Sequence, residues 1–188
     1  MCWIKKILKS ILHGLGTKKT PTLSKEELWR SRGVNIGKNF DGPDSTIDYC
    51  FGHLVTIGDN VTISGTTILA HDGTTKKFLG YCKVAPVKIG NDVFIGYGSI
   101  VLPGVTIGNK VIVGAGTVCS KDIPDNLVVV RGKNTTYRIL CTYDEYIETQ
   151  RKRMKNFPIS NTLFSNRTDV EWEIWQKELE KFGGGFDL

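Results

Sequence analysis

The feature that most constrains the fold of this chain is a six-residue period of aliphatic side chains in its middle. Steps of six residues give two parallel series, and Gly, Ala or Ser follows most members of the first. The first series is Ile89, Ile95, Val101, Ile107, Val113 and Cys119, and the second is Val93, Ser99, Val105, Val111 and Thr117. Earlier in the chain the same register gives Phe51, Ile57, Ile63 and Leu69, paired with Tyr49, Val55, Val61 and Thr67. Because this period is neither 2 nor 3.6, it is not that of an isolated strand or helix.

A period of six predicts a triangular solenoid in which each hexad forms one short flat side and one corner. One aliphatic side chain per hexad points into the prism, and the small residue that follows it fits the crowded turn. Three hexads make a coil of about eighteen residues, and successive coils pair as parallel strands at roughly 4.8 Å. Each coil buries its apolar face only by stacking on the next, so the open ends need covers. The expected fold class is mainly β, a parallel β-helix with helices at both ends.

One long interruption breaks the repeat. Twenty residues separate Leu69 from Ile89 where one hexad needs six, so we expect an extruded loop at residues 73–86. This loop begins immediately after His71 and Asp72. The predicted organisation is an N-terminal helical segment (1–33), a β-helix domain (34–136) that contains the loop, and a C-terminal helical extension (137–188).

Three capping boxes predict where the helices begin. Ser24, Thr142 and Thr168 are each followed three residues later by a glutamate, so that side chains satisfy the free amides of a helix start. The corresponding helices are expected to end at Gly33, before Pro158 and at Gly183. The last one carries an apolar stripe of Trp172, Trp175, Leu179 and Phe182, expected to pack on the solenoid or on another subunit.

The charge of the chain is concentrated at its N-terminus. The formal net charge is +6, and residues 1–32 alone carry eight Lys/Arg and two Glu, so the remainder is neutral. This distribution argues against a nucleic-acid groove across the domain. Residues 1–16 are predicted to form a basic amphipathic helix. Such a helix could bind the anionic inner face of a membrane or pack on the open end of the domain. The five cysteines show no CxxC spacing, and no secretory signal is recognised, so a cytoplasmic protein is expected.

The repeat resembles the bacterial hexapeptide-repeat acyltransferases over residues 34–140. The similarity rests on the segments 55–63, 68–72, 93–96, 102–108, 113–116 and 120–124. It includes Val-Thr-Ile-Gly-Asp-Asn-Val at Val55–Val61 and Leu-Pro-Gly-Val-Thr-Ile-Gly at Leu102–Gly108. The pattern is similar to maltose, galactoside and xenobiotic acetyltransferases, and most similar to the O-acetyltransferases of capsule and O-antigen clusters. This resemblance implies a left-handed β-helix and a homotrimer with active sites at subunit interfaces.

The resemblance also implies the catalytic chemistry. Acetyl transfer to a hydroxyl needs a base and donors for the developing oxyanion. His71 occupies the base position, and Asp72 is expected to help orient its ring or to shape the site. Imidazole has an ordinary pKa of about 6.5 and is mostly neutral in cytoplasm. His53 lies eighteen residues earlier, so we expect it to stack on His71 from the neighbouring coil. The acceptor is expected to meet His53 and the loop residues Lys76, Lys77, Phe78 and Tyr81.

The implied donor is acetyl-CoA, held along a groove between coils. The matching positions are Gly96, Tyr97, Gly98, Ser99, Gly114 and Ala115, with Ser120 and Lys121 toward the phosphates. Backbone amides near Gly96–Ser99 are also expected to hold the oxyanion. Many relatives continue with a Gly-Asn-Pro-Ala-Lys-like segment, which residues 131–138 replace without a proline. Lys133 and Arg138 are the expected phosphate partners there.

These features favour an acetyl-CoA-dependent O-acetyltransferase acting on a sugar of a capsular or O-antigen polysaccharide. The alternatives are a xenobiotic (chloramphenicol- or streptogramin-type) or amino-sugar N-acetyltransferase, and a non-catalytic β-helix that holds an assembly together. A zinc-dependent β-helix carbonic anhydrase is disfavoured because only His53 and His71 lie in the solenoid. No metal is expected, and neither is a cysteine nucleophile at Cys82.

Overall fold

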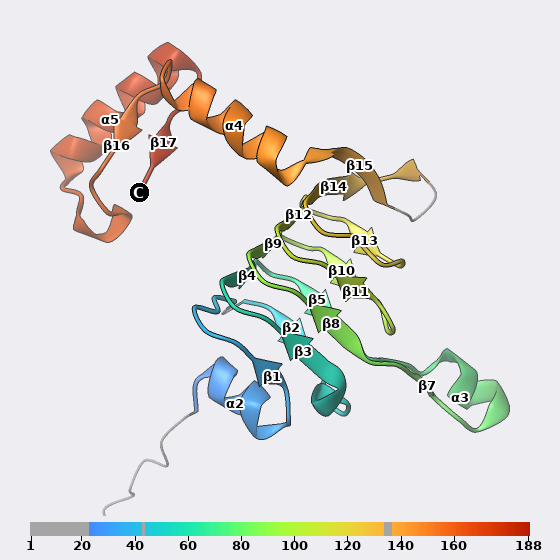
Figure 1. The fold of residues 1–188 in the computed structure, drawn as a ribbon. Coiled ribbons are helices and arrows are strands. Elements are labelled where there is room, and N and C mark those ends of the chain that lie inside the picture. Colours follow the sequence, from blue (N-terminus) through green and yellow to red (C-terminus); the bar gives the residue numbers. More distant parts are fainter. Residues whose placement is uncertain (1–22, 43, 134–136) are drawn as a thin grey trace, which may run out of the picture.

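The protein is described by a computed structural model that covers residues 23–42, 44–133 and 137–188. Its central part is a parallel β-helix whose strands stack into three sheets (Figure 1). The first sheet contains β1 (Asn35–Ile36), β3 (Val55–Ile57), β8 (Val87–Ile89) and β11 (Thr106–Ile107). The second contains β4 (Val61–Ile63), β9 (Val93–Ile95), β12 (Val111–Val113), β14 (Leu127–Arg131) and β15 (Tyr137–Thr142). The third contains β2 (Thr46–Ile47), β5 (Thr67–Ile68), β10 (Ile100–Val101) and β13 (Val118–Cys119).

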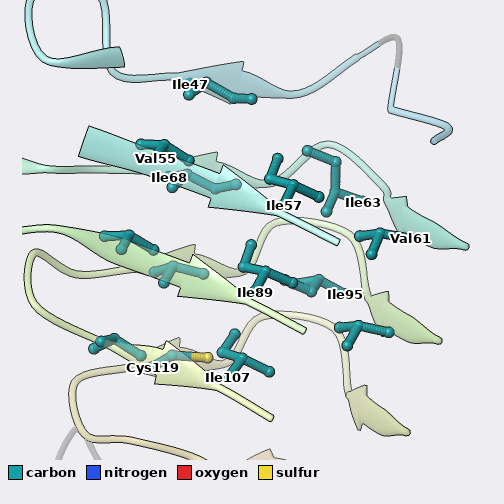
Figure 2. Close-up of a cluster of buried hydrophobic side chains, with 14 of the residues drawn as sticks. Ile47, Val55, Ile57, Val61, Ile63, Ile68, Ile89, Ile95, Ile107 and Cys119 are labelled. Atoms are coloured by element: carbon teal, nitrogen blue, oxygen red, sulfur yellow. The ribbon is translucent and has the colours of Figure 1, made fainter. Parts of the chain in front are cut away.

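Aliphatic side chains from all three sheets fill the prism (Figure 2). Both series predicted from Ile89 and Val93 onward are buried, from 3% exposure at Ile89 and Val105 down to 0% at Val113 and Cys119. Val93 pairs with Val111 and Ile100 with Val118, which is the predicted offset of one eighteen-residue coil. The period of six therefore identified the inward positions correctly over this part of the chain.

The earlier register was wrong at four positions. Tyr49 is 72% exposed, and Phe51, Thr67 and Leu69 are only partly buried. The inward residues are instead Ile47, Ile68 and Ala70. Ile63 pairs with Ile95 but Thr67 pairs with Ile100, so the corner between β4 and β5 is one residue shorter than the corner between β9 and β10. This missing residue shifts the following inward positions by one.

The three corners of each coil stack into three edges of the prism. Residues 58–60, 90–92 and 108–110 form the edge between the first and second sheets. Residues 64–66, 96–99 and 114–117 form the edge between the second and third, called here the glycine edge because Gly65, Gly98 and Gly116 adopt positive φ there. Residues 48–54, 69–86, 102–105 and 120–122 form the edge between the third and first, called here the histidine edge.

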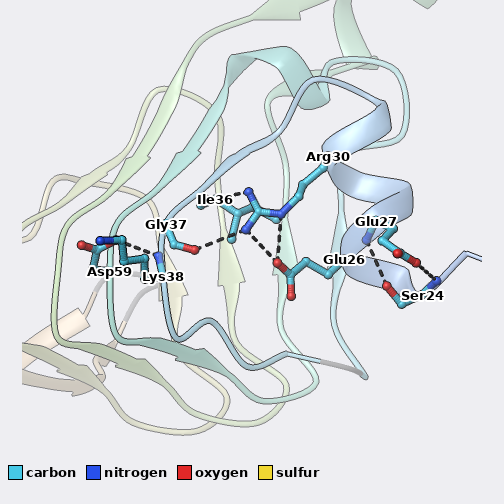
Figure 3. Close-up of polar contacts among 8 residues, drawn as sticks. All are labelled: Ser24, Glu26, Glu27, Arg30, Ile36, Gly37, Lys38 and Asp59. Carbon is cyan, nitrogen blue, oxygen red and sulfur yellow. Dashed lines mark hydrogen bonds and ion pairs between the residues drawn. The ribbon is translucent and has the colours of Figure 1, made fainter.

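The N-terminal end of the prism is covered by α2 (Lys25–Ser31), which begins with the predicted capping box at Ser24 (Figure 3). Trp29 is 5% exposed and packs edge-on against Phe40, with ring centroids 6.0 Å apart. The Arg30 guanidinium donates to the Glu26 carboxylate at 2.7 Å and to the Ile36 carbonyl at 2.7 Å. The helix is thereby fixed on β1, so the first coil does not present a bare sheet edge.

The interruption of the repeat is a hairpin that projects from the histidine edge (Figure 1). Its two strands, β6 (His71–Asp72) and β7 (Lys83–Val84), pair antiparallel, and α3 (Thr74–Leu79) lies between them. Offsets of 32 or 33 residues between paired positions replace the usual eighteen, as in Thr67 with Ile100. His71 and Asp72 thus belong to the hairpin itself, at the point where it leaves the coil.

The C-terminal residues form a small unit beyond the last coil. β15 turns back antiparallel on β14 and leads into α4 (Tyr143–Met154), followed by β16 (Ile159–Ser160), η3 (Phe164–Asn166), α5 (Asp169–Phe182) and β17 (Phe186–Asp187). The capping boxes at Thr142 and Thr168 are present, and α5 ends at Gly183 in the left-handed conformation.

The apolar stripe of α5 packs locally. The Arg167 guanidinium lies 4.7 Å from the Trp172 ring centroid and 5.4 Å from that of Trp175, and it pairs with Asp187. Trp175 is 7% exposed, whereas Phe182 is 46% exposed. The structure therefore gives the two tryptophans partners within the C-terminal unit itself. Within the described residues, no helix is long and apolar enough to cross a bilayer.

Candidate active site

A buried carboxylate holds the ring of His71. The Asp48 Oδ2 atom lies 2.6 Å from His71 Nδ1 and also accepts the amides of Ala70 at 2.9 Å and His71 at 3.0 Å. Its Oδ1 atom accepts the amides of Cys50 and Phe51, each at 3.0 Å. Asp48 is 3% exposed, which is tolerable for a carboxylate only when its oxygens are satisfied in this way.

The electrostatics of this pair set the state of the imidazole. Burial raises the pKa of Asp48, but the His71 ring and the amides of Ala70 and Phe51 outweigh it, so the pKa of the carboxyl lies below its ordinary value. An ionised Asp48 accepts only, so Nδ1 must carry the proton. In the neutral ring the lone pair then resides on Nε2. Because the side chain of His71 is 32% exposed, this arrangement suits a base that acts through Nε2.

The ring of His71 is bonded by Asp48 and not by Asp72, for which either an orienting role or a part in shaping the site was predicted. Asp72 Oδ1 accepts the Thr74 amide at 2.8 Å and the Thr74 hydroxyl, and these bonds hold its pKa below the ordinary value. The carboxylate therefore fixes the start of α3, while Asp48 orients the ring. One signal was available in the sequence: Asp48 directly follows the inward Ile47, at a position that Leu69 and Leu102 occupy in the next two coils.

A groove of about 540 Å³ opens beside His71 along the histidine edge. Leu69, Leu102 and Ser120 each follow an inward residue of β5, β10 and β13, so they stand in line on three successive coils. The remaining lining residues are Asp72, Gly73, Lys83 and Pro103. The groove is therefore an elongated channel that runs across the coils, apolar on its floor and polar near the hairpin.

His53 does not stack on His71 as predicted. Ile47 pairs with Ile68, an offset of 21 residues, because the first coil contains an extra turn, η1 (Gly52–Leu54), at this edge. The Phe51 ring lies between the two histidines, with centroids 5.1 Å from His71 and 6.2 Å from His53.

The other predicted acceptor residues lie on the projecting hairpin. Lys76, Lys77 and Phe78 belong to α3, and Tyr81 follows it. Phe78 is 76% exposed and Tyr81 81% exposed, and none of the four lines the groove of its own chain. They remain predictions for contact with an acceptor.

The predicted donor residues fall on two different edges. Ser120 lines the groove and Lys121 follows it on the histidine edge. The six remaining repeat positions, Gly96, Tyr97, Gly98, Ser99, Gly114 and Ala115, lie on the glycine edge. Ser99 is 1% exposed, and its hydroxyl donates to the Gly114 carbonyl at 3.2 Å, so it acts in packing. Lys133 and Arg138 are exposed beside the last coil. One chain alone does not bring these residues together.

No group of three or more His, Cys, Asp or Glu side chains is placed to hold a metal ion within residues 23–42, 44–133 and 137–188. Asp48 and His71 lie together, but the carboxylate already accepts hydrogen bonds from four residues.

Comparisons with known proteins agree with this geometry. Residues 86–121 match the family described as bacterial transferase hexapeptide (six repeats). The chain is 44% identical to Protein CapG of Staphylococcus aureus over 121 residues, which are 61% of this chain and 69% of CapG. It is 38% identical to the galactoside O-acetyltransferase of Escherichia coli K12 over 101 residues, which are 50% of this chain and 48% of that protein.

Solved structures show the same architecture. A galactoside acetyltransferase in complex with coenzyme A superposes with a TM-score of 0.50 at 25% identity, covering 77% of this chain and 83% of that one. The hexapeptide-repeat acetyltransferase VCA0836 of Vibrio cholerae, complexed with acetyl-CoA, superposes with a TM-score of 0.51 at 22% identity over 73% of this chain and 88% of that one.

A prism of six-residue repeats is the architecture of the hexapeptide-repeat proteins, and the relatives named above are transferases of that class. The chain belongs to the bacterial hexapeptide-repeat transferase family, as its repeats predicted. It is an acetyltransferase of that family, and its β-helix is left-handed.

Proposed function

We propose that this chain transfers an acetyl group from acetyl-CoA to a hydroxyl of a sugar acceptor, in the synthesis of a capsular or O-antigen polysaccharide. The observation that carries this proposal is the Asp48–His71 pair at the mouth of the 540 Å³ groove. It provides a base with a fixed tautomer beside a channel long enough for an extended substrate arm. The named activities of the galactoside O-acetyltransferases support the choice of a sugar hydroxyl.

In the proposed mechanism, His71 Nε2 removes the proton of the acceptor hydroxyl as its oxygen attacks the thioester carbonyl carbon. The thioester supplies an activated acetyl group and a sulfur leaving group. The new C–O bond forms, the C–S bond breaks, and the imidazolium of His71 returns its proton to the departing sulfur. Asp48 keeps the ring aligned and stabilises its transient positive charge. General-base help of this kind contributes roughly 10²–10⁴ in rate.

The groove suits the pantetheine arm of the donor. Leu69, Leu102 and Pro103 offer an apolar floor along which a flexible chain can lie. Ser120 and Lys121 stand at the end away from His71, where the diphosphate of coenzyme A would follow. The two relatives solved with coenzyme A or acetyl-CoA bound support this donor.

A homotrimer would complete the site. The residues expected to bind the donor lie on the histidine edge and on the glycine edge, which one chain cannot bring together. A three-fold arrangement of prisms would place the glycine edge of one copy against the histidine edge of the next. The exposed side chains of Phe78 and Tyr81 on the hairpin would then meet the neighbouring copy, together with Lys76 and Lys77.

The N-terminal segment lies outside the described residues, so its role remains a proposal. Residues 1–16 would hold the enzyme at the inner face of the membrane, near a lipid-linked acceptor. Deleting them should weaken binding to vesicles containing phosphatidylglycerol without changing the acetylation of a soluble sugar. Unchanged vesicle binding after the deletion would leave only a packing role.

The decisive test is release of free thiol from acetyl-CoA in the presence of hydroxyl-only and amine-bearing sugars. Acceptor-dependent release by the wild type, lowered about 10²–10⁴-fold in His71→Ala, is expected with hydroxyl-only sugars. His13→Ala is the matched control and should retain full activity. Release that requires an amine would establish the N-acetyltransferase alternative. No release and no coenzyme A binding would establish the non-catalytic alternative.

A further inference from the structure

The histidine edge continues past His71 toward the N-terminal end of the prism. The pairing of Ile47 with Ile68 sets the offset between the first two coils at 21 residues, so the turn at Cys50 lies next to His71. The amides of Cys50 and Phe51 and the ring of His71 all bind the same Asp48 carboxylate. Tyr49, in the middle of this turn, is 72% exposed. His71 therefore borders both the groove and this turn, whose Phe51 ring lies 5.1 Å from the imidazole.

An arginine covers the exposed tyrosine. The Cζ atom of Arg32 lies 4.0 Å from the centroid of the Tyr49 ring. Arg32 follows the end of α2, and its side chain takes part in no hydrogen bond or ion pair with any residue that the structure describes. Arg30, two residues earlier, is bonded to Glu26 and to two carbonyls. Arg30 is thus committed to the fold, whereas the five N–H donors of Arg32 are not.

Among the described residues, no acidic side chain pairs with this arginine. Asp48 is the carboxylate of the same turn, but it is buried and saturated by Cys50, Phe51, Ala70 and His71. A guanidinium held over an aromatic ring keeps a fixed plane, and its fork matches a carboxylate or phosphate with two parallel hydrogen bonds. The exposed tyrosine adds an apolar face and a hydroxyl. This combination suits a sugar ring that carries an anionic group.

The groove and the turn beside His71 thereby differ in chemistry. The groove is lined by Leu69, Leu102 and Pro103, which suit the pantetheine arm, while the turn that follows Asp48 carries the Tyr49 ring with the Arg32 cation over it. Acetyl transfer needs donor and acceptor to approach one imidazole together. With the donor in the groove, the turn that carries Tyr49 and Arg32 is the next surface along the histidine edge.

We infer, resting on the proposed acetyl transfer, that the acceptor is an anionic saccharide and that Arg32 and Tyr49 form its binding platform. The anionic group is a ring carboxylate, as in a uronic acid, or a sugar phosphate. Arg32 binds this group, Tyr49 supports the ring, and the hydroxyl to be acetylated reaches His71. The pair thereby selects the acceptor, and its contribution is to binding rather than to the proton transfer.

The test compares acceptors that differ in one group. Acetylation kinetics are measured with methyl glucuronide against methyl glucoside, methyl galacturonide against methyl galactoside, and the corresponding sugar 1-phosphates. Wild type should prefer one anionic class, and Arg32→Met should raise KM for that class about 10- to 100-fold with little change in kcat. KM for the neutral sugar should not change. The class of acceptor whose KM rises in Arg32→Met shows whether the anionic group bound is a carboxylate or a phosphate.

Matched variants separate this role from folding. Lys38→Met removes one exposed positive charge from another edge at the same end of the prism and should leave every KM unchanged. Arg32→Lys keeps the charge without the planar fork and should show an intermediate KM, while Tyr49→Ala should weaken binding of neutral and anionic sugars alike. Thermal melting of each variant checks the fold, and Arg32→Gln replaces Arg32→Met if the latter unfolds.

Equal use of neutral and anionic acceptors by the wild type, or an equal KM change for both in Arg32→Met, would overturn the inference. Titration calorimetry measures binding of the uronides and sugar phosphates directly, so the inferred platform can be tested even if no acetyl transfer is observed. Binding of an anionic sugar that Arg32→Met abolishes supports the platform even where acetyl transfer fails. Transfer to neutral sugars alone, with no anion binding, rejects the platform and leaves the proposed transferase intact.

Discussion

The Oδ2 atom of Asp48 lies 2.6 Å from the Nδ1 atom of His71, and the two residues are 23 positions apart in the chain. The carboxylate belongs to the first coil and the imidazole to the hairpin that leaves the second coil. The orientation of the His71 ring therefore depends on how two coils stack, and not on a neighbouring residue in the sequence. Any change that shifts this stacking should affect activity before it affects the overall fold.

Asp48→Asn should lower acetyl transfer about 10-fold or more. The amide keeps the volume of the carboxylate but cannot stabilise an imidazolium, and its NH₂ group faces backbone amides that need an acceptor. The loss should appear in kcat, measured by thiol release at saturating acceptor and donor.

Asp72→Asn is the matched control, because that carboxylate bonds Thr74 and not the ring. It should change kcat by less than about 3-fold, since only a hydrogen bond at the start of α3 is altered. A larger loss in Asp72→Asn than in Asp48→Asn would return the orienting role to Asp72.

The stability of the protein should fall in acid, in part through Asp48. The pKa of Asp48 is lower in the folded state than in the unfolded state. Its contribution to the free energy of unfolding is therefore complete above the unfolded pKa of about 3.9, and it is lost as the pH falls through the folded pKa. Asp48→Asn should therefore unfold with a shallower dependence on pH below about 4. Urea unfolding followed by circular dichroism between pH 2.5 and 6 measures this, and identical slopes in the two proteins would contradict it.

Much of the fold could be read from the sequence because the repeat reports directly on burial. Val93, Ile95, Val111 and Val113 are inward in the structure as the period of six requires. The three capping boxes likewise depend on side chains within one turn, so local pattern was enough to predict them.

The orienting residue could not be read in the same way. The expected stacking of His53 on His71 assumed coils of equal length, but the first coil is longer by the turn Gly52–Leu54 and one corner near Gly65 is a residue shorter. Small changes of coil length move side chains between neighbours without disturbing the apolar period. The residue that bonds His71 depends on how neighbouring coils align in space, and this alignment could not be predicted from one sequence.

The buried cysteine should be inert in the folded protein. Cys119 is 0% exposed in the core, and burial raises the pKa of its thiol to about 12, so almost no thiolate exists at pH 8. Cys50 is exposed in the turn beside His71. Iodoacetamide at pH 8, followed by peptide mass spectrometry, should modify Cys50 within minutes and Cys119 only after urea is added. Rapid native labelling of Cys119 would show that the coils open.

The close stacking of coils should make some glycines irreplaceable and others not. A Cβ atom added at Gly90 would lie 2.7 Å from the carbonyl carbon and oxygen of Gly108 in the next coil. Neither backbone atom can move without breaking the ladder, so Gly90→Ala should lower the free energy of unfolding by about 1–3 kcal/mol. At Gly73 nothing lies within 4 Å of such a Cβ atom. Gly73→Ala should therefore stay within about 1 kcal/mol of the wild type. Melting temperatures measured by circular dichroism at equal protein concentration compare the two variants. Equal melting temperatures for Gly90→Ala and Gly73→Ala would contradict this prediction. They would show that the backbone at this corner shifts to make room for the added Cβ atom.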